Sequence, residues 1–222
     1  MAELILGIDD AGRGPVVGPM VLAGCLIDAS IQDELKKLGV KDSKQVTAKR
    51  RELLAEAIRA KAETFEIVLA FPSEIDGKNK DGINLNKLEA LKCAEIINKI
   101  NKGFKSIKVI IDCPSVSIAP WQDYLKTKIN NLSNLEVICE HKADVNHVAV
   151  SAASILAKSI REKEMDKLRE KYGQQIGSGY CSDPATVKFL KDYALKYKED
   201  GLFRQSWITW KNAIAMDEQK TL

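Results

Sequence analysis

The chain of 222 residues has few of the residues that build zinc sites and disulfide frameworks. It contains 2 histidines and 5 cysteines, and the cysteines stand singly, with no Cys-x-x-Cys pair. A structural zinc site needs such ligands in closely spaced sets, so we expect none. An odd number of isolated cysteines also suits a reducing compartment, and we therefore predict a cytoplasmic protein.

Long apolar runs, internal repeats and low-complexity tracts are also lacking. No run is long enough to span a membrane, and no secretory signal precedes the first apolar segment, so we expect no membrane partner. The net charge of +3 is too small to indicate a nucleic-acid partner by itself, although it permits a local basic face. The length suffices for one domain with a sizeable core and a small appendage.

The most informative stretch lies at the start of the chain. An apolar run over residues 4–8 ends in two adjacent carboxylates, Asp9 and Asp10, and a glycine-rich turn precedes a second apolar run over residues 16–27. Two such runs, separated by Gly and Pro, predict a pair of strands. A carboxylate at the edge of the core is costly unless it is paired or holds a metal. A plain acidic turn is the competing interpretation.

Further along, helical and strand patterns alternate and then give way to helices. This order predicts a mixed α/β sheet of five strands flanked by helices, with a catalytic domain over residues 1–182 and a C-terminal helical subdomain over residues 183–222. Residues 76–82 read as a polar loop. The remaining strands are expected at 65–71, 107–111 and 135–139, and helices at 31–38, after a Thr47 cap, after an Asn84 cap, at 120–132, at 148–172, from an Asp183 cap to Tyr197, and around Trp207, Trp210 and Ile214.

Two further acids, Asp112 and Asp144, come at or just after predicted strands, as Asp9 does. Ligands gather at the carboxyl ends of strands in α/β sheets, so these acids are expected to converge. Converging carboxylates repel unless cations neutralise them, and oxygen ligands without histidine or thiolate favour Mg²⁺ or Mn²⁺. A pair of such ions, about 4 Å apart, serves phosphodiester cleavage. Taken singly, Asp112 also reads as a turn acid and Asp144 as a helix cap.

Several motifs, in order along the chain, resemble the ribonuclease HII family, and most closely its archaeal single-chain form. The likeness runs from the first predicted strand into the helical tail. The motifs are Gly7-Ile8-Asp9-Asp10-Ala11-Gly12-Arg13-Gly14-Pro15, Asp42-Ser43-Lys44, Ile111-Asp112, His141-Lys142-Ala143-Asp144, Ser151-Ala152-Ala153-Ser154-Ile155-Leu156-Ala157-Lys158 and Gly177-Ser178-Gly179-Tyr180.

The resemblance implies a ribonuclease H-like fold and Mg²⁺- or Mn²⁺-dependent hydrolysis of the RNA strand of RNA–DNA hybrids. It also implies incision 5′ of ribonucleotides embedded in duplex DNA, leaving 3′-hydroxyl and 5′-phosphate ends. The family's catalytic metal ligands, Asp, Glu, Asp and Asp, fall on Asp9, Asp10, Asp112 and Asp144. Asp10 departs from the pattern, and its carboxylate reaches about 1.5 Å less far than that of Glu. A natural variant, an engineered change and a site that relies on Mn²⁺ are three open explanations.

The resemblance also names residues that bind substrate. The bare backbone of the turn Gly12-Arg13-Gly14 can approach a sugar closely, and the family uses it to sense the ribose 2′-OH. Tyr180 is expected to pack on the neighbouring deoxyribose, and Cys181 stands where the family usually has proline. Phosphate contacts are expected from Arg13, Ser43, Lys44, Lys158 and Arg161. Ser154, on the same helical face as Lys158 and Arg161, is expected to bind substrate.

Each of these assignments has a plainer alternative. The glycines suit an ordinary hairpin turn, Arg13 a solvated loop, the tyrosine a core position, and Lys158 and Arg161 a solvated helix face. The rival functions are another nuclease or strand-transfer enzyme of the same fold, and a hybrid-binding protein without cleavage. We expect a monomer. A sliding clamp is a candidate partner that residues 217–222 do not support, because they contain no aromatic clamp-binding tail.

Overall fold

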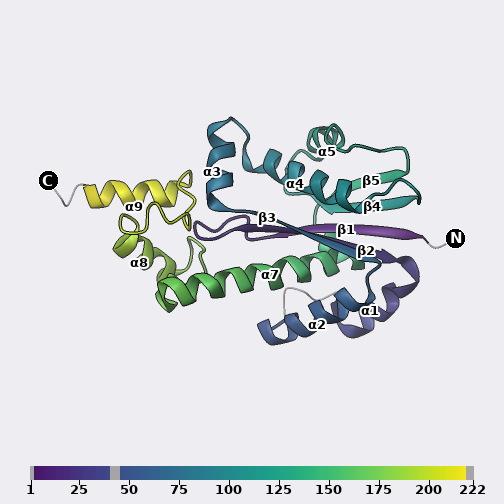
Figure 1. Ribbon diagram of the computed structural model, residues 1–222, viewed down its shortest axis with the longest axis horizontal. Helices are drawn as coiled ribbons and strands as arrows, with labels where there is room; N and C mark the ends of the chain where they lie inside the picture. Colours follow the sequence, from purple (N-terminus) through teal and green to yellow (C-terminus); the bar gives the residue numbers. More distant parts are fainter. Residues whose placement is uncertain (1–2, 41–45, 219–222) are drawn as a thin grey trace. The chain divides into compact units, whose positions relative to one another are not determined.

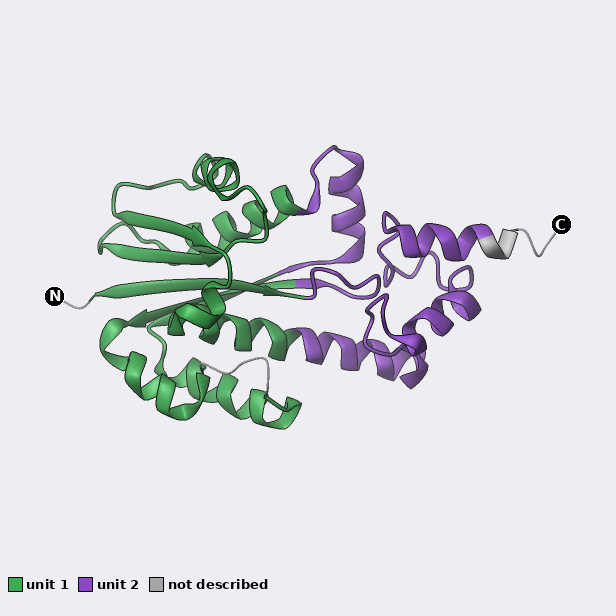
Figure 2. Ribbon diagram, turned by 180° about the vertical axis from the view of Figure 1, so that it is seen from behind, with its two compact units in different colours: residues 1–11, 21–68, 86–160 green, residues 12–20, 69–85, 161–222 purple. Residues whose placement is uncertain are grey.

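The computed structural model describes residues 3–40 and 46–218 (Figure 1). The chain divides into two compact units, unit 1 with residues 1–11, 21–68 and 86–160, and unit 2 with residues 12–20, 69–85 and 161–222 (Figure 2). The elements are β1 (Leu4–Ala11), β2 (Met20–Asp28), α1 (Gln32–Leu38), α2 (Ala48–Lys61), β3 (Thr64–Ala70), α3 (Pro72–Lys80), α4 (Leu85–Ile100), β4 (Ile107–Asp112), α5 (Ile118–Lys126), β5 (Leu135–Glu140), α6 (Ala143–Asn146), α7 (Val148–Tyr172), α8 (Pro184–Tyr193) and α9 (Ile208–Glu218).

The strands form one mixed sheet in the order β3-β2-β1-β4-β5. β1 runs antiparallel to β2, from Leu4 opposite Asp28 to Ala11 opposite Val21. β4 runs parallel to β1, and β5 runs parallel to β4. The predicted five-stranded mixed sheet is therefore confirmed, and its central strand β1 carries the first two acids.

Two glycines show how closely helices pack on the two faces of this sheet. A Cβ added at Gly7 of β1 would lie 2.1 Å from the carbonyl carbon of Ala149 in α7. A Cβ added at Gly24 of β2 would lie 2.3 Å from the side chain of Ile96 in α4. Gly24 pairs with Ile8, the residue after Gly7, and successive residues of a strand face opposite sides. Helices α7 and α4 thus cover opposite faces of the sheet (Figure 1).

Local signals predicted most helix starts correctly. Thr47 caps α2 by accepting a hydrogen bond from the backbone N–H of Arg50, and Asp183 caps α8, which begins at Pro184. The predicted loop over residues 76–82 is wrong, because residues up to Lys80 belong to α3. Pro72 sets the backbone angle for the first turn of this helix, and buried Ile75 anchors it under a mostly polar sequence.

Other boundaries also differ from the predictions. The second apolar run enters the sheet only at Met20, since Pro19 has no N–H to donate to a neighbouring strand. Val17 instead forms an isolated bridge with Phe203. Helix α5 ends at Lys126, short of the predicted end at Leu132, and α8 ends at Tyr193, short of the predicted end at Tyr197.

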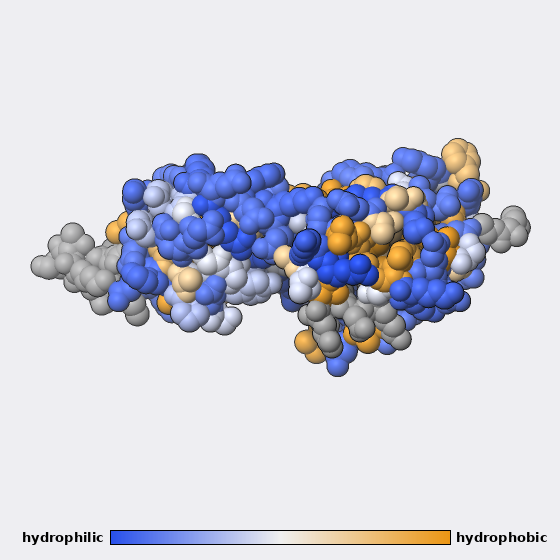
Figure 3. Space-filling view, turned by 90° about the horizontal axis from the view of Figure 1, so that it is seen from below, coloured by the Kyte–Doolittle hydropathy of each residue, from blue (hydrophilic) through white to orange (hydrophobic). Residues whose placement is uncertain are grey.

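Unit 2 has its own apolar core. Phe203 packs against Trp210 of α9 with ring centroids 4.6 Å apart, and both residues are buried. Trp210 therefore packs the tail helix into this core, whereas the domain boundary after residue 182 stays a prediction. Within the described residues, no helix is both long and apolar enough to cross a membrane. The face drawn in Figure 3 is mainly hydrophilic, with a smaller hydrophobic area.

Candidate active site

Three acids from distant parts of the sequence meet in unit 1. Asp9, Asp112 and Asp144 each offer one carboxylate oxygen, and these oxygens lie within 4.8 Å of one another. The parallel pairing of β1 with β4 ends at Ile8 opposite Ile111, so Asp9 and Asp112 are the next residues on adjacent strands. Asp144 comes from the short helix α6 that follows β5. The sheet topology thus brings together the three acids that the sequence predicted to converge.

Backbone groups orient these carboxylates. Asp112 Oδ1 accepts a hydrogen bond from the backbone N–H of Ala143 at 3.2 Å, and Asp9 Oδ1 accepts one from the N–H of Asp10 at 2.8 Å. Lys142, with a φ of 59°, turns the chain in the left-handed region just before α6. This turn delivers both the Ala143 N–H and the Asp144 side chain to the cluster.

Burial makes it costly for the carboxylates of the cluster to carry negative charge. Asp9 is 7% exposed and Asp144 is 5% exposed, while Asp112 is half-buried. Burial, together with the negative charges of Asp10 and Asp112, raises the pKa of Asp9 to about 8, and the Ser154 hydroxyl opposes this rise. A divalent cation would neutralise these charges, and a donor set made only of carboxylate oxygens fits a hard ion such as Mg²⁺ or Mn²⁺.

Asp10 lies outside this group of three among the described residues. Strand β1 continues past it to Ala11, so Asp9 faces α7 with Gly7 and Asp10 faces α4 with Ile8. There it lines a recess shared by Ile8, Asp9, Asp10, Leu22, Glu89, Cys93, Ile111, Asp112 and Pro114.

Sequence reasoning missed Glu89, a carboxylate of α4 that lines the same recess and is 2% exposed. The available signal was a glutamate placed directly beside Leu88 on the core-facing stripe of α4. An acid at such a position is costly to bury unless it is compensated. Glu89 therefore belongs to the surroundings of the acidic cluster.

The predicted substrate contacts of unit 1 occupy different environments. Ser154 is fully buried on α7, and its hydroxyl acts to lower the pKa of Asp9. Lys158, one turn further along α7, is half-buried. Ser43 and Lys44 lie outside the described residues. The substrate-binding role of these residues stays a prediction.

In unit 2, the glycine turn packs on a buried arginine. Gly12 has a φ of +82°, and a Cβ there would lie 2.1 Å from Nε of Arg161. Arg161 is 8% exposed, and burial lowers the pKa of its guanidinium. Its Cζ lies 5.1 Å from the ring centroid of Tyr180, and its Nη2 donates to the carbonyl of Ser178 at 3.3 Å. Arg161 thus supports the ring of Tyr180, which is 41% exposed.

The loop that carries Tyr180 is tied down at both ends. Asp183 Oδ2 accepts from the backbone N–H and the hydroxyl of Ser178, each at 2.7 Å. The carbonyl of Gly179 accepts from the N–H of Val16 at 2.9 Å, two residues after the glycine turn. Backbone bonds therefore connect the Tyr180 loop to the segment that follows Gly14.

Comparison with known proteins identifies the family. The model of the family described as Ribonuclease HII matches residues 6–210. This chain belongs to the ribonuclease HII family. Members of the family are metal-dependent nucleases, and the sheet and helices of this chain have the ribonuclease H-like fold.

Individual relatives cover almost the whole chain. A ribonuclease HII of Methanococcus maripaludis is 41% identical over 221 residues, which are 99% of this chain and 91% of that protein. The crystal structure of the ribonuclease H2 from Pyrococcus horikoshii is similar with a TM-score of 0.84 and 36% identity, covering 95% of this chain and 96% of that one. The ribonuclease HII in the structure of the PCNA:RNase HII complex from Archaeoglobus fulgidus is similar with a TM-score of 0.80 and 37% identity, covering 94% and 96%.

Proposed function

We propose that this chain hydrolyses the RNA strand of RNA–DNA hybrids and incises duplex DNA 5′ of embedded ribonucleotides, with Mg²⁺ or Mn²⁺ as cofactor. The observation that carries the proposal is the set of three carboxylates whose oxygens lie within 4.8 Å of one another. In a chain of the ribonuclease HII family, such a set supports cation-assisted phosphodiester hydrolysis. The products would carry 3′-hydroxyl and 5′-phosphate ends.

Asp9, Asp112 and Asp144 would hold the divalent ions, with Asp10 as the fourth acid of the predicted set. Bound ions supply a water of lowered pKa and neutralise charge on the phosphate. The protein's part is to keep the ligands in place. The backbone N–H of Asp10 donates to Asp9, and the backbone N–H of Ala143 donates to Asp112. These bonds leave the carboxylates little freedom, as the strict geometry of Mg²⁺ requires.

Recognition of ribose is assigned to the turn Gly12-Arg13-Gly14 and to Tyr180. A Cβ added at Gly14 would lie 3.9 Å from Cε1 of Tyr180, so the exposed backbone of Gly14 and an exposed ring lie side by side in unit 2. Backbone groups can bond a 2′-OH while the ring packs on the adjacent sugar. An all-DNA strand lacks that hydroxyl, leaving the protein group that bonds it without a partner.

The test is a cleavage assay on three duplexes: one with a single embedded ribonucleotide, an RNA–DNA hybrid, and all DNA. We expect incision of the first two with Mg²⁺ or Mn²⁺ and none of the third. Asp144→Asn should abolish incision, whereas Asp166→Asn, which changes an exposed acid on α7, should leave it intact. Cleavage of all three duplexes at comparable rates would favour another nuclease of this fold. Tight hybrid binding without cleavage in either metal would favour a binding protein.

A sliding clamp stays a candidate partner of this chain, because the Archaeoglobus relative was solved in a complex with PCNA.

A further inference from the structure

A buried arginine grips the backbone of the glycine turn. Arg204 is 0% exposed and is among the largest fully buried side chains of the described structure. Its Nη2 donates to the carbonyl of Gly12 at 2.6 Å, and its Nη1 donates to the carbonyl of Arg13 at 2.7 Å. Nε and Nη2 also donate to the carbonyl of Gly18, at 3.1 and 3.0 Å. One guanidinium thus satisfies carbonyls on both sides of the turn, all within unit 2.

Trp207 holds the remaining carbonyl of the turn. Its indole N–H donates to the carbonyl of Gly14 at 3.1 Å, and the guanidinium carbon of Arg204 lies 5.1 Å from its ring centroid. The three consecutive carbonyls of Gly12, Arg13 and Gly14 are therefore all held by two side chains that stack on each other.

Peptide geometry shows how these hydrogen bonds orient the turn. In a planar trans peptide, the carbonyl of one residue and the N–H of the next point in opposite directions. Fixing the carbonyls of Gly12 and Arg13 therefore fixes the N–H groups of Arg13 and Gly14, which point away from the arginine. Gly14 is exposed and lies beside Tyr180. The two N–H groups are oriented before any ligand arrives, which reduces the entropic cost of binding.

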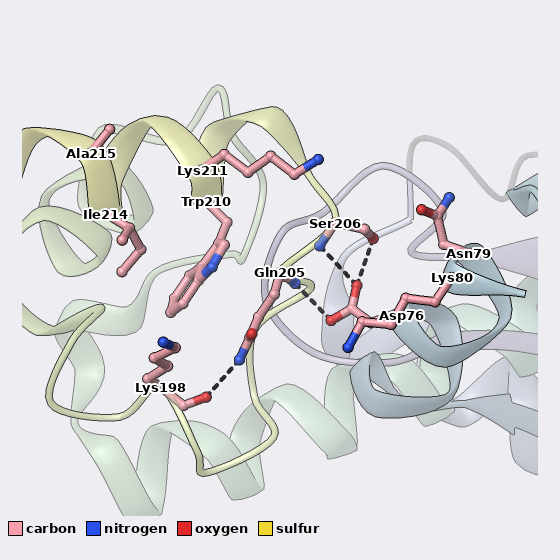
Figure 4. Close-up of a pocket in the computed structure, with 10 residues that line it drawn as sticks. All are labelled: Asp76, Asn79, Lys80, Lys198, Gln205, Ser206, Trp210, Lys211, Ile214 and Ala215. Carbon is pink, nitrogen blue, oxygen red and sulfur yellow. Dashed lines mark hydrogen bonds between the residues drawn. The ribbon is translucent and has the colours of Figure 1, made fainter.

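The segment that carries Arg204 is itself anchored. Asp76 of α3 accepts hydrogen bonds from the backbone N–H of Gln205 at 2.7 Å and of Ser206 at 2.9 Å, and from the Ser206 hydroxyl at 2.5 Å (Figure 4). On the other side, the N–H of Arg204 donates to the carbonyl of Val16 at 2.8 Å. Helix α3, which the sequence did not predict, thus supplies the support for this arginine.

We propose that Arg204, together with Trp207, is a positioning residue that sets the orientation of the turn for ribose recognition. The proposal rests on the function proposed above. Two side chains from the C-terminal part of the chain thereby control the selectivity that the turn exerts through its backbone. Neither side chain needs to contact the nucleic acid.

The decisive variant is Trp207→Phe, which keeps an aromatic ring near Arg204 and removes one hydrogen bond to the turn. Arg204→Lys removes the fork of donors but risks misfolding because the residue is buried. The matched control is Trp210→Phe, an indole removed three positions later, at the core of the same unit. The measurements are kcat and KM for the single-ribonucleotide duplex, and the inhibition constant of an all-DNA duplex as competitor at fixed salt.

For Trp207→Phe we expect kcat/KM to fall by about five-fold, the worth of one hydrogen bond. The inhibition constant of the all-DNA duplex should stay within about two-fold of that of the wild type, because phosphate contacts carry that binding. Trp210→Phe should change neither quantity. For a folded Arg204→Lys protein, kcat/KM should fall further than for Trp207→Phe.

Equal loss in both quantities for Trp207→Phe, or a kcat/KM matching that of Trp210→Phe, would overturn the positioning role while the wild type still incises. A wild type that incises no ribonucleotide-containing duplex would instead remove the proposed function, and this inference with it. The activity of the wild type alone therefore distinguishes the two failures.

Discussion

The substitution Gly7→Ala tests the packing that places the acidic cluster. The added Cβ would lie 2.1 Å from the carbonyl carbon of Ala149 and 2.3 Å from the backbone nitrogen of Val150, both in α7. Ordinary van der Waals contact begins at 3.4 Å, so β1 and α7 must part by 3.4 minus 2.1, or about 1.3 Å, at this point. The obstacle is helix backbone, which cannot rotate away as a side chain can.

The expected loss of stability follows from this geometry. Overpacking a core costs typically 1–3 kcal/mol, and a clash with backbone belongs at the upper end, so we expect about 3 kcal/mol. For a chain of this size, each kcal/mol lowers Tm by roughly 2–4 °C, which gives a loss of roughly 6–12 °C. The same displacement moves Ser154 away from Asp9. At 25 °C, where the protein is still folded, activity should therefore fall by at least about ten-fold.

Thermal unfolding of Gly7→Ala and of a matched control measures this effect. Gly77→Ala makes the same chemical change in helix α3, where an added Cβ meets nothing within 4 Å. This control should be more stable than the wild type by about 0.5–1 kcal/mol, because alanine favours helix. A Gly7→Ala protein with the Tm and activity of the wild type would refute the close packing of α7 on β1.

Three further predictions concern single side chains. Asp10→Glu should raise the Mg²⁺-supported incision rate by about ten-fold, since the longer side chain extends the carboxylate into the recess shared with Asp9 and Asp112, and equal or lower activity in a metal titration would contradict it. Tyr180→Ala should lower incision at a single ribonucleotide by about ten-fold while hybrid affinity changes little, which paired kinetic and binding measurements at fixed salt would check; equal losses would count against its role. Hydrogen bonds from Ser178 lower the pKa of Asp183 to about 2, from an ordinary value of 3.8, so the carboxylate stabilises the fold above the ordinary value and loses this effect as the pH falls through about 2. Asp183→Asn should accordingly lower Tm at pH 7 and match the wild type near pH 2, whereas a pH-independent difference would exclude this linkage.

Much of the fold is written in local patterns. β-branched runs predicted the strands, and capping residues such as Thr47 and Asp183 predicted where helices begin. Helix α3 escaped prediction because its polar residues outnumber its apolar ones, and only the burial of Ile75 shows which side faces the core. Boundaries such as the start of β2 escaped because they depend on which neighbour accepts a hydrogen bond.

The acidic cluster illustrates how far sequence reasoning reaches. Three acids that each follow a strand were expected to converge, because parallel strands end at one edge of a sheet, and Asp9, Asp112 and Asp144 do lie together. The placement of Asp10 could not be read in this way. Antiparallel pairing with β2 continues β1 to Ala11, and this pairing directs neighbouring side chains to opposite faces.

The kinds of residue, their order and the strand-then-acid pattern belong to the sequence, because they depend only on near neighbours along the chain. The role of Arg204 does not, since an arginine by itself predicts a solvated side chain. Its carbonyl partners on Gly12 and Gly18 lie 192 and 186 positions away. Only the folded chain brings those carbonyls around one guanidinium, because a buried cation persists only where donors and acceptors are matched in space.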